Sequence, residues 1–432
     1  MDFKGKKVIL LGAGRSNAAV MKYAHGLGAD IELREYDKTR VTGEFLKYCT
    51  SIKTGEKYTE KLDCDILVKT PVIRADIPEI VDAQKNGAVL TSDVRLFFAG
   101  TKARIIGITG SSGKSTTTAL IYEMLKKSGK KAYIGGNTGV PLMNYINLPP
   151  DAFVAAELSS FQLSDAEKSP HTAVVTNIYP NHLDVHKSME EYIGAKKNIM
   201  CTCPQKAVLN YDDEIVRGFC GAKKTVYFST RSSDADVFFR GGYIYAGGEK
   251  FFDTSKIKIP GDFNIKNYMA AAAAVMDICG KNAMIAAAEE FRGVPHRNMF
   301  IGCVNGVNYF DSSIDSSPDR TAATLSAYDK KVILLAGGRG KGVPYDSLEE
   351  PFRSKVKLLI TTGENAAEIN RVAEKSGIRY MSAANYAEAA AYAARAAAEG
   401  DTVLLSPAST AFDAFRDFEE RAEFFKRCVM RI

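Results

Sequence analysis

The stretch "RIIGITGSSGKSTTTALIYEML", residues 104–125, constrains the fold of this 432-residue chain more than any other segment. An apolar run typical of a buried strand leads into a glycine-rich turn, and Gly113-Lys114-Ser115 then opens an amphipathic helical pattern. Such a turn lets backbone N–H groups face phosphate oxygens, and the helix N-terminus adds positive potential. The lysine can reach the β- and γ-phosphates, and the serine hydroxyl can hold Mg²⁺. The stretch therefore predicts an α/β protein that binds ATP.

The glycine spacing differs from the strict G-x-x-x-x-G-K pattern, because that pattern needs glycine at position 108, where the chain has isoleucine. An incidental lysine after a glycine turn is still a poor explanation, since strand, turn, Lys-Ser pair and helix all coincide. The residues predicted to contact ATP here are Gly110, Ser111, Ser112, Gly113, Lys114, Ser115 and Thr116.

Composition limits the class of protein. With 46% apolar and 25% charged residues, the chain is an ordinary globular one. It has no apolar run near the ~20 residues that cross a bilayer, and its start reads as a strand instead of a signal peptide. The net charge of +6 includes no long basic block, so nucleic acid is not an expected partner. The eight scattered cysteines predict free thiols in a reducing compartment. We expect a cytoplasmic protein without membrane insertion.

Strand-like runs alternate with helical patterns along most of the chain, which predicts α/β layers. Three sets of strands divide the chain into an N-terminal Rossmann-like domain, a central mixed-sheet domain of the P-loop ATPase type and a C-terminal Rossmann-like domain. The expected borders are 1–93, 94–296 and 297–432. In the central domain, the segments 226–228, 237–240 and 243–245 look antiparallel. An alanine-rich helix is expected to end at Gly400.

Polar residues follow two strands of the central domain. Glu157 ends the apolar run of "FVAAELSSFQL" and should emerge at the carboxyl edge of the sheet, where a Mg²⁺ ligand or a helix cap is equally plausible. His182, Asp184 and His186 follow the run at 173–178. Their proximity fits a zinc site as well as a supporting role at an ATP site.

The N-terminal domain carries a weaker signal. Gly12-Ala13-Gly14 follows the first strand, but Asn17 occupies the third position of the dinucleotide fingerprint. The turn predicts a phosphate or nucleotide near a helix N-terminus, and Asp37 stands where such folds hold a ribose or base. Tight packing of the strand against the helix explains both features equally well.

The polar stretch "DSSIDSSPDR", residues 311–320, follows a strand-like run and is either a solvated loop or part of a site. Two further glycine- or serine-rich loops, "GGRGKG" at 337–342 and "SPASTAF" at 406–412, also follow apolar runs. We expect the three loops to share one edge of the C-terminal sheet.

With these motifs assembled, the chain resembles the Mur ligase family over all three domains. The motifs that carry the resemblance are "GITGSSGKST", "ELSSFQL", "GGNTGVP", "NHLDVH", "FNIKNYMAAAA" and "GVPHR". The resemblance implies Glu157 as a Mg²⁺ ligand, with Asn137 and His182 at substrate and the second metal ion. It places Asn267, Arg297 and Asp311 near adenosine. Arg15, Ser16, Asp37 and Thr70 fall where the uridine diphosphate part of a substrate is held.

Lys196, in "SMEEYIGAKKN", aligns with a family lysine that is carbamylated and helps to hold the second Mg²⁺. On sequence alone it looks like a surface lysine beside Lys197. Carbamylation requires a neutral amine, which low solvation and nearby cations favour.

The activity implied by the resemblance is an ATP-dependent ligation of D-glutamate to UDP-N-acetylmuramoyl-L-alanine by a bacterial, cytoplasmic enzyme, expected to be a monomer. The substrate carboxylate attacks the γ-phosphorus of ATP, and the amine of D-glutamate then attacks the acyl phosphate. Lys114, His182 and Lys196 are the expected catalytic residues, with Ser115 as a further metal ligand.

The acceptor amino acid is less firmly implied. Lys341 and Phe418 match family positions at the D-glutamate site, but Ala411 stands where a serine is common. The usual D-S-K-[AS]-T-N pattern also changes, with Ser313 in place of lysine and Asp315 in place of threonine. An aspartate repels an acidic acceptor unless it turns away or pairs with a base such as Arg320. A different amino-acid acceptor therefore stays open.

Three other readings compete. A folylpolyglutamate-synthase-like ligase shares the phosphate loop but lacks a leading uridine-binding domain. A nicotinamide-dependent dehydrogenase explains the Gly12–Gly14 turn and leaves "GSSGKST" unused. A non-catalytic nucleotide switch leaves the polar residues at two strand ends without a role.

Overall fold

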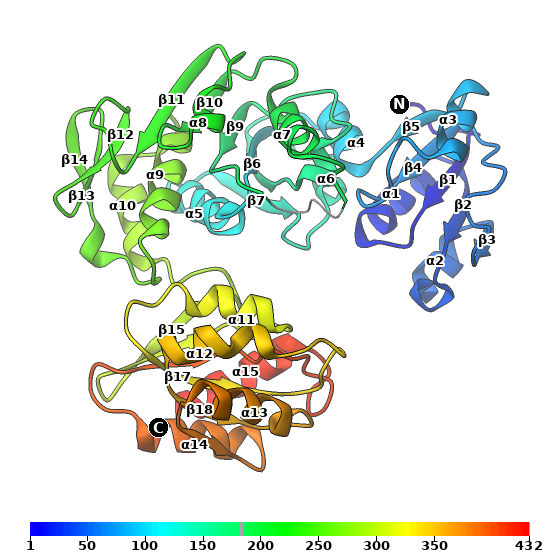
Figure 1. Ribbon diagram of the computed structural model, residues 1–432. Helices are drawn as coiled ribbons and strands as arrows, with labels where there is room; N and C mark the ends of the chain where they lie inside the picture. Colours follow the sequence, from blue (N-terminus) through cyan, green and yellow to red (C-terminus); the bar gives the residue numbers. More distant parts are fainter. Residues whose placement is uncertain (181–184, 432) are drawn as a thin grey trace. The chain divides into compact units, whose positions relative to one another are not determined.

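The computed structural model describes residues 1–180 and 185–431. They form three sheets with helices packed against them, as Figure 1 shows. The chain divides into two compact units, one of residues 1–253 with 266–288 and one of residues 254–265 with 289–432. Each unit is described by itself below. The first unit contains the first two sheets, and the predicted domain borders after residues 93 and 296 remain predictions.

The first sheet is parallel, with strand order β3-β2-β1-β4-β5. Its central strand is buried on both faces, because Val8 and Leu10 pack against α1 and α2 while Ile9 and Leu11 pack against α3. This explains its continuous apolar run. The elements are β1 (Lys7–Leu11), α1 (Arg15–Gly26), β2 (Asp30–Glu35), α2 (Gly43–Tyr48), β3 (Ser51–Thr54), β4 (Ile66–Lys69), α3 (Pro78–Lys85) and β5 (Val89–Thr91).

A short helix joins the first sheet to the second. In α4 (Asp93–Gly100), Ser92 caps the N-terminus by accepting from the Arg95 N–H. Val94 and Phe97 are buried in a core cluster that also holds Leu10 of β1 and Val154 of the central sheet. The two sheets of the first unit therefore share one continuous hydrophobic core.

The central sheet has the order β14-β13-β12-β11-β10-β9-β6-β8-β7. Its strands from β7 to β12 are parallel, whereas β12, β13 and β14 form antiparallel hairpins. The strands are β6 (Arg104–Thr109), β7 (Lys131–Gly136), β8 (Ala152–Glu157), β9 (Thr172–Val175), β10 (Lys206–Asn210), β11 (Lys224–Ser229), β12 (Val237–Arg240), β13 (Tyr243–Ala246) and β14 (Glu249–Asp253). The helices are α5 (Lys114–Lys127), α6 (Ser160–Leu163), α7 (Met189–Lys197), α8 (Glu214–Arg217), α9 (Phe263–Val275) and α10 (Lys281–Glu290).

One sequence expectation for this sheet is wrong. The segment 226–228 lies in β11, which pairs in parallel with both β10 and β12. The turn at Gly241-Gly242 does form the expected antiparallel hairpin between β12 and β13. The predicted mixed sheet is thus confirmed, with its antiparallel part beginning one strand later.

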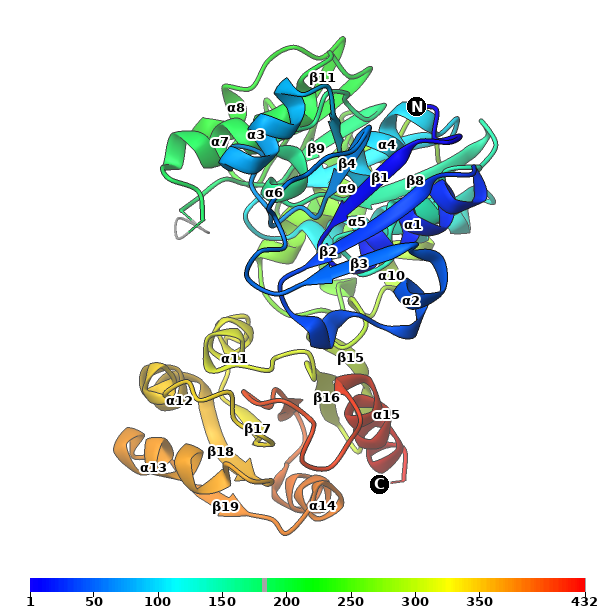
Figure 2. The same ribbon diagram turned by 90° about the vertical axis from the view of Figure 1, so that its right-hand side faces the viewer.

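The sheet of the second unit has the order β15-β16-β20-β17-β18-β19, and only the β15–β16 pairing is antiparallel. Helices α11, α12 and α13 cover one face and α14 and α15 cover the other, as Figure 2 shows. The strands are β15 (Met299–Val304), β16 (Val307–Asp311), β17 (Val332–Ala336), β18 (Val356–Thr361), β19 (Tyr380–Ser382) and β20 (Thr402–Leu405). The helices are α11 (Pro318–Leu325), α12 (Glu349–Lys355), α13 (Ala366–Ser376), α14 (Tyr386–Ala396) and α15 (Phe418–Val429).

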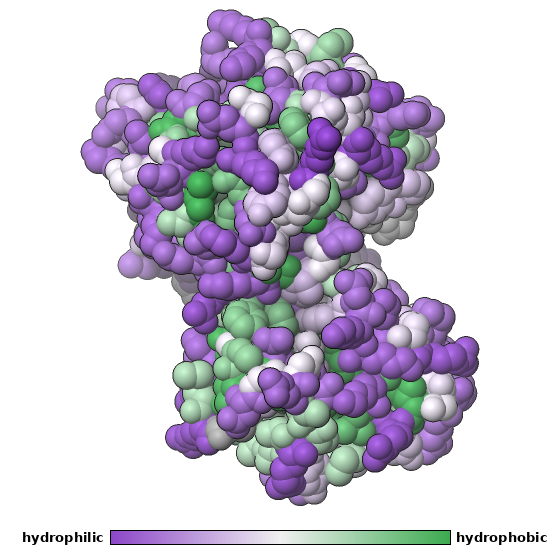
Figure 3. All heavy atoms as spheres, turned by 90° about the vertical axis from the view of Figure 1, so that its left-hand side faces the viewer, coloured by the Kyte–Doolittle hydropathy of each residue, from purple (hydrophilic) through white to green (hydrophobic). Residues whose placement is uncertain are grey.

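The surface is mostly polar. Hydrophilic residues predominate on the face drawn in Figure 3, with apolar side chains in small patches. Among the described residues, no helix is both long and apolar enough to cross a membrane. All eight cysteines are free thiols, as the sequence predicts.

Candidate active site

The glycine-rich loop joins β6 to α5, as the sequence predicts. Gly110 (φ 148°) and Gly113 (φ 79°) have positive φ, which favours glycine. A Cβ at Gly110 would collide with the Thr176 hydroxyl. The Lys114 ammonium donates to the carbonyl oxygens of Gly110 (2.9 Å) and Ser111 (3.1 Å). The loop is therefore folded around its own lysine at the N-terminus of α5.

Neighbouring elements hold this loop. The Ser111 hydroxyl lies 2.9 Å from the Tyr192 hydroxyl, and the Ser112 N–H donates to Oδ1 of Asn177 (2.9 Å). Asn267 of α9 packs so closely that a Cβ at Gly113 would collide with its amide oxygen. Asn267, which the resemblance placed near adenosine, thus lies beneath the start of α5.

Two predicted residues follow the loop in α5. Ser115 is buried and Thr116 is partly buried in the first turn of the helix. A hydroxyl at this end of the helix lies among N–H groups that have no partner within the helix.

Glu157 ends β8, directly beside β6. Its side chain is buried, and one carboxylate oxygen, Oε1, accepts from the Asn137 amide at 2.9 Å. The other oxygen, Oε2, is buried and has no hydrogen-bond partner among the described residues. An orphaned buried carboxylate oxygen is costly, so the position fits a cation ligand better than a helix cap.

Lys196 is buried, so the interpretation as a surface lysine is wrong. It lies in α7, only 2% exposed, and its ammonium donates to the Gly110 carbonyl at 2.7 Å. Burial, reinforced by the charge of Lys114, lowers the pKa of Lys196 to about 7, while Glu157 acts in the opposite direction. Near neutral pH, much of this amine is therefore uncharged beside the phosphate loop.

His182 and Asp184 lie outside the described residues. Among the residues that are described, no group of three His, Cys, Asp or Glu side chains is arranged to hold a metal ion. His186 is buried and its Nε2 lies 2.9 Å from the Ser160 hydroxyl. The described residues therefore give no support to a zinc site that includes His186.

A cleft of about 300 Å³ lies between the first and central sheets. Four of the residues predicted to hold a uridine diphosphate substrate line it: Arg15, Ser16, Thr70 and Asn137. The cleft also reaches the Gly12–Gly14 turn and the residues just after Glu157, namely Ser159, Phe161 and Gln162. The predicted nucleotide turn and the central sheet thus contribute to one cleft.

Asp37 is not brought to this cleft. Its exposed carboxylate accepts from the N–H and hydroxyl of Thr39 and caps a short turn beyond β2. The lining residue from β2 is the buried Glu35, whose carboxylate accepts from Ala13 N (2.6 Å) and Asp37 N (3.0 Å). Tyr36 stands between Glu35, which ends β2, and Asp37. The sequence pattern did not show which of the two acids, Glu35 or Asp37, lines the cleft.

Asn17 explains the incomplete fingerprint. It is fully buried, and its amide donates to the carbonyl oxygens of Leu11 and Gly12, each at 2.9 Å. The side chain fastens the turn from within, so a glycine is not required at this position.

In the second unit, Asp311 ends β16 and is buried. Its carboxylate meets Nδ1 of His296 at 2.9 Å and accepts from the N–H and hydroxyl of Ser313. The hydrogen bond that His296 makes to the Asp311 carboxylate raises the pKa of His296. The His296 ring also contacts the Phe418 ring edge to face, with centroids 5.7 Å apart. His296 therefore links a predicted adenosine residue to a predicted acceptor residue, and it neighbours the predicted Arg297.

Asp315 turns inward. It is buried, and its Oδ2 accepts from the hydroxyls of Thr324 and Ser406, both at 2.7 Å. The Arg320 guanidinium donates to the Ile314 carbonyl oxygen instead of pairing with the Asp315 carboxylate. Burial raises the pKa of Asp315, and the charge of Arg297 is among the opposing effects. Asp315 therefore turns away, which is the first of the two arrangements expected to avoid repulsion of an acidic acceptor.

The three strand-end loops of the second unit do meet at one edge. The Lys341 ammonium donates to the Ser316 hydroxyl at 2.9 Å, which joins the 337–342 loop to the 311–320 stretch. Arg339 and Thr410 form an isolated bridge that joins the 337–342 loop to the 406–412 loop. Ala411 is buried, only 2% exposed.

Sequence reasoning missed Arg421. This side chain of α15 is fully buried and donates to the carbonyl oxygens of Ser313 (2.9 Å), Ser409 (3.0 Å) and Thr410 (3.1 Å). It ties two of the three loops together. Arg421 lies four residues before the buried Phe425, and residues i and i+4 share one face of a helix. This spacing was the available sequence signal for its burial.

The fold and the phosphate loop define a nucleotide-binding enzyme with three sheets, and comparison with known proteins identifies its class. Residues 108–275 match the Mur ligase middle domain, and residues 296–409 match the Mur ligase glutamate ligase domain. The chain belongs to the Mur ligase family, because relatives with 43% and 40% identity align with 99% of it and 97% of their own lengths. They come from Acetivibrio thermocellus and Ruminiclostridium cellulolyticum, and each is named UDP-N-acetylmuramoylalanine–D-glutamate ligase.

Solved structures agree with the fold. A UDP-N-acetylmuramate–alanine ligase from Thermotoga maritima has a TM-score of 0.59 at 19% identity over 99% of both chains. A pseudomurein peptide ligase type C from Methanothermus fervidus has a TM-score of 0.54 at 18% identity, over 99% of this chain and 100% of its own. The predicted three-domain α/β fold is thereby confirmed.

Proposed function

We propose that this chain is an ATP-dependent ligase that joins D-glutamate to UDP-N-acetylmuramoyl-L-alanine in peptidoglycan precursor synthesis. The observation that carries the proposal is the cluster at one sheet edge: the Lys114 loop, the orphaned oxygen of Glu157 and the buried Lys196. Family membership and the names of relatives such as the one at 43% identity support the particular substrates.

The reaction has two chemical steps. The alanine carboxylate attacks the γ-phosphorus of ATP, the bond to the β-phosphate oxygen breaks, and an acyl phosphate and ADP result. The amine of D-glutamate then attacks the acyl carbon, loses a proton and displaces inorganic phosphate. Negative charge gathers on the transferred phosphoryl group in the first step, so positive charge at the loop accelerates it.

Within this scheme, Lys114 and the N–H groups at the start of α5 bind the β- and γ-phosphates. The Lys114 ammonium lies within hydrogen-bond distance of its own loop carbonyls, so ATP would draw it outward to the phosphates. Gly110 and Gly113 keep the backbone open to close approach, which side chains there would obstruct.

Magnesium is the expected metal. Ser115 and the Oε2 oxygen of Glu157 would hold it, because hydroxyl and carboxylate oxygens are the ligands that it prefers. When bound, Mg²⁺ neutralises phosphate charge and orients the γ-phosphoryl group. His182 is a proposed ligand of a second ion and lies outside the described residues.

Carbamylation of Lys196 is part of the proposal. The reaction joins a neutral amine to CO₂ and releases a proton, and a pKa of about 7 makes the neutral amine available at physiological pH. The carbamate would carry a negative charge, which the nearby Lys114 ammonium would stabilise.

For the substrates, we infer that the cleft lined by Arg15, Ser16, Thr70 and Asn137 takes the uridine diphosphate part. Lys341 and Phe418 are the proposed contacts of D-glutamate, and the inward turn of Asp315 removes one source of repulsion. Arg297 and Asp311 are proposed to approach adenosine.

A second candidate is a family member with another amino-acid acceptor, which the buried Ala411 in place of a serine favours. The experiment is a phosphate-release assay with ATP, UDP-N-acetylmuramoyl-L-alanine and a panel of D- and L-amino acids, with product masses. Release that depends on D-glutamate and yields the D-glutamyl product supports the proposal. A stronger response to another acceptor would replace D-glutamate and leave the ligase class intact.

We further infer that the protein acts as a monomer in the bacterial cytoplasm. The proposed substrates are small molecules, and all the proposed contacts lie within a single chain. Light scattering of the active enzyme tests this inference, and a stable dimer would contradict it.

A further inference from the structure

Two segments that belong to different sheets line the proposed substrate cleft. The loop after β4 supplies Thr70, Pro71 and Val72, and the segment at the start of α6 supplies Ser159, Phe161 and Gln162. The first loop belongs to the first sheet and the second to the central sheet. The width of the cleft therefore depends on what holds these two loops at their distance.

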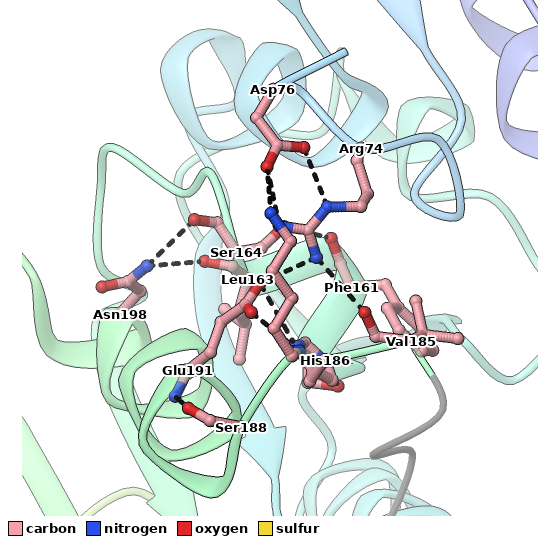
Figure 4. Close-up of polar contacts among 12 residues, drawn as sticks. Arg74, Asp76, Phe161, Leu163, Ser164, Val185, His186, Ser188, Glu191 and Asn198 are labelled. Carbon is pink, nitrogen blue, oxygen red and sulfur yellow. Dashed lines mark hydrogen bonds and ion pairs between the residues drawn. The ribbon is translucent and has the colours of Figure 1, made fainter.

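Four charged side chains connect the first loop to the segment that leads into α7, as Figure 4 shows in part. Arg74 donates to Oε1 of Glu191 at 2.8 Å, and Lys187 donates to Oδ2 of Asp76 at 3.0 Å. We call these four residues, Arg74, Asp76, Lys187 and Glu191, the four-charge latch. Each side contributes one cation and one anion, so both links are attractive.

The latch is also cross-braced within each side. The Arg74 guanidinium binds Asp76 through two hydrogen bonds, of 2.8 and 2.9 Å, and donates to the Val185 carbonyl at 3.2 Å. The Lys187 N–H donates to the second oxygen of Glu191 at 2.9 Å. The contacts of Arg74 and Lys187 hold the pKa of Asp76 well below its usual range, and those of the Lys187 backbone and Arg74 lower the pKa of Glu191.

His186 continues the connection to the segment at the start of α6. Its ring stacks in parallel on Phe161, with centroids 5.1 Å apart and planes 2° apart, and its Nε2 lies 2.9 Å from the Ser160 hydroxyl. Residues 185–191 thus contact Phe161, which lines the cleft, and also Arg74 and Asp76, which follow the lining residues of the first loop.

We propose that the four-charge latch positions these two segments of the substrate cleft, with Arg74 as its central positioning residue. The inference rests on the proposed function for the identity of the ligand, the UDP-linked substrate. Arg74 does not line the cleft, so it acts through the loop that carries Thr70, Pro71 and Val72. Loss of the latch should weaken binding of that substrate and leave ATP binding and the chemical step intact.

The chain offers a matched control. Arg95 of α4 forms an ion pair with Glu167 and is not among the residues that line this cleft. Both pairs join an arginine from the first 100 residues to a glutamate of the central region. A general effect of losing an arginine–glutamate pair would appear in either variant, whereas a positioning effect would appear only in Arg74→Met.

The experiment measures steady-state kinetics and ligand-free hydrogen exchange of Arg74→Met, Glu191→Gln, the double variant and Arg95→Met. We expect Arg74→Met to raise the KM for the UDP-linked substrate about five-fold, with kcat and the KM for ATP within about two-fold of wild type. The KM of the double variant should be no higher than that of Arg74→Met, because both substitutions remove the same Arg74–Glu191 contact. Arg95→Met should match wild type.

Hydrogen exchange keeps the test independent of the substrate. Faster exchange of amides in 70–76 and 158–163 in Arg74→Met, and not in Arg95→Met, supports the latch. Unchanged exchange together with an unchanged KM overturns it, as does a fall in kcat with no change in KM. If Arg74→Met does not fold, Glu191→Gln replaces it, and a wild-type KM with unchanged exchange for that variant overturns the proposal. Failure of the wild type to use the UDP-linked substrate would contradict the proposed function, while the exchange result would still decide the latch.

Discussion

At the scale of single residues, the chemistry depends on charges held near the glycine-rich loop. Lys114 and Lys196 both donate to the Gly110 carbonyl, and Glu157 affects the pKa of Lys196. One ammonium group, one lysine amine with a lowered pKa and one carboxylate therefore lie near the edge where β6 and β8 end. The positive charge of Lys114 suits the negative charge of a transferred phosphoryl group.

Replacing Lys114 tests the loop directly. We expect Lys114→Ala to lower ATP-dependent phosphate release at least ~100-fold, because charge on the transferred phosphoryl group loses its main side-chain partner. The circular dichroism spectrum and melting temperature should change little. Lys126→Ala, an exposed lysine of the same helix, serves as the control. Activity within a few fold of wild type would contradict the role of the loop.

The lowered pKa of Lys196 predicts a pH effect on stability. The folded protein binds this proton with a pKa of about 7, whereas an unfolded lysine binds it near the ordinary lysine pKa of 10.5. Between these values the unfolded chain holds more protons, so the free energy of unfolding should rise with pH from about 7 to 10. Denaturant unfolding in CO₂-free buffer measures it, and Lys196→Met should show a smaller rise. An equal rise in both proteins would argue against a buried neutral amine.

At the scale of elements, Arg421 of α15 holds the loops after β16 and β20. We expect Arg421→Met to destabilise the protein by about 3 kcal/mol, since three carbonyl oxygens lose their donor in a buried place. Thermal unfolding of this variant and of Arg416→Met, whose arginine is exposed, gives the comparison. Equal melting temperatures for the two variants would contradict the role of Arg421.

Strands buried on both faces were predictable from their apolar runs, whereas the mostly exposed strands β3 and β19 were not. Strands β1, β6 and β17 have unbroken apolar runs, because helices cover both faces of the parallel sheets. Strands β3 and β19 have mostly exposed side chains, so their sequences show no such run. The alanine-rich helix α14 ends at Ala396 instead of Gly400, because alanine favours a helix without fixing its end.

The site residues likewise divide into those that the sequence could predict and those that it could not. The end of a buried strand pointed to Glu157, since residues at the carboxyl edge of a parallel sheet face ligands, whereas the family resemblance pointed to Asp311. Lys196 looked exposed because its burial depends on contacts between α7 and a loop that is 86 positions away in sequence. Asp37 and Glu35 could not be ranked from sequence, because a shift of two residues along the strand end exchanges their positions.

At the scale of the whole molecule, the three sheets carry the proposed nucleotide loop, the proposed substrate cleft and the proposed acceptor edge. The first two features lie within one compact unit and the third lies in the other. Catalysis by such an enzyme requires all three ligands to react in one complex, because the acyl phosphate must meet the amine before water does.

The most direct test of the proposed mechanism follows the carboxylate oxygens of the substrate through one turnover. The enzyme is given UDP-N-acetylmuramoyl-L-alanine labelled with ¹⁸O in both carboxylate oxygens, together with ATP and D-glutamate, and the products are weighed by mass spectrometry. The proposed mechanism predicts one ¹⁸O in each released phosphate and one in the new amide, because the attacking carboxylate oxygen leaves with the phosphoryl group. Unlabelled phosphate, or phosphate release without an amide product, would contradict it.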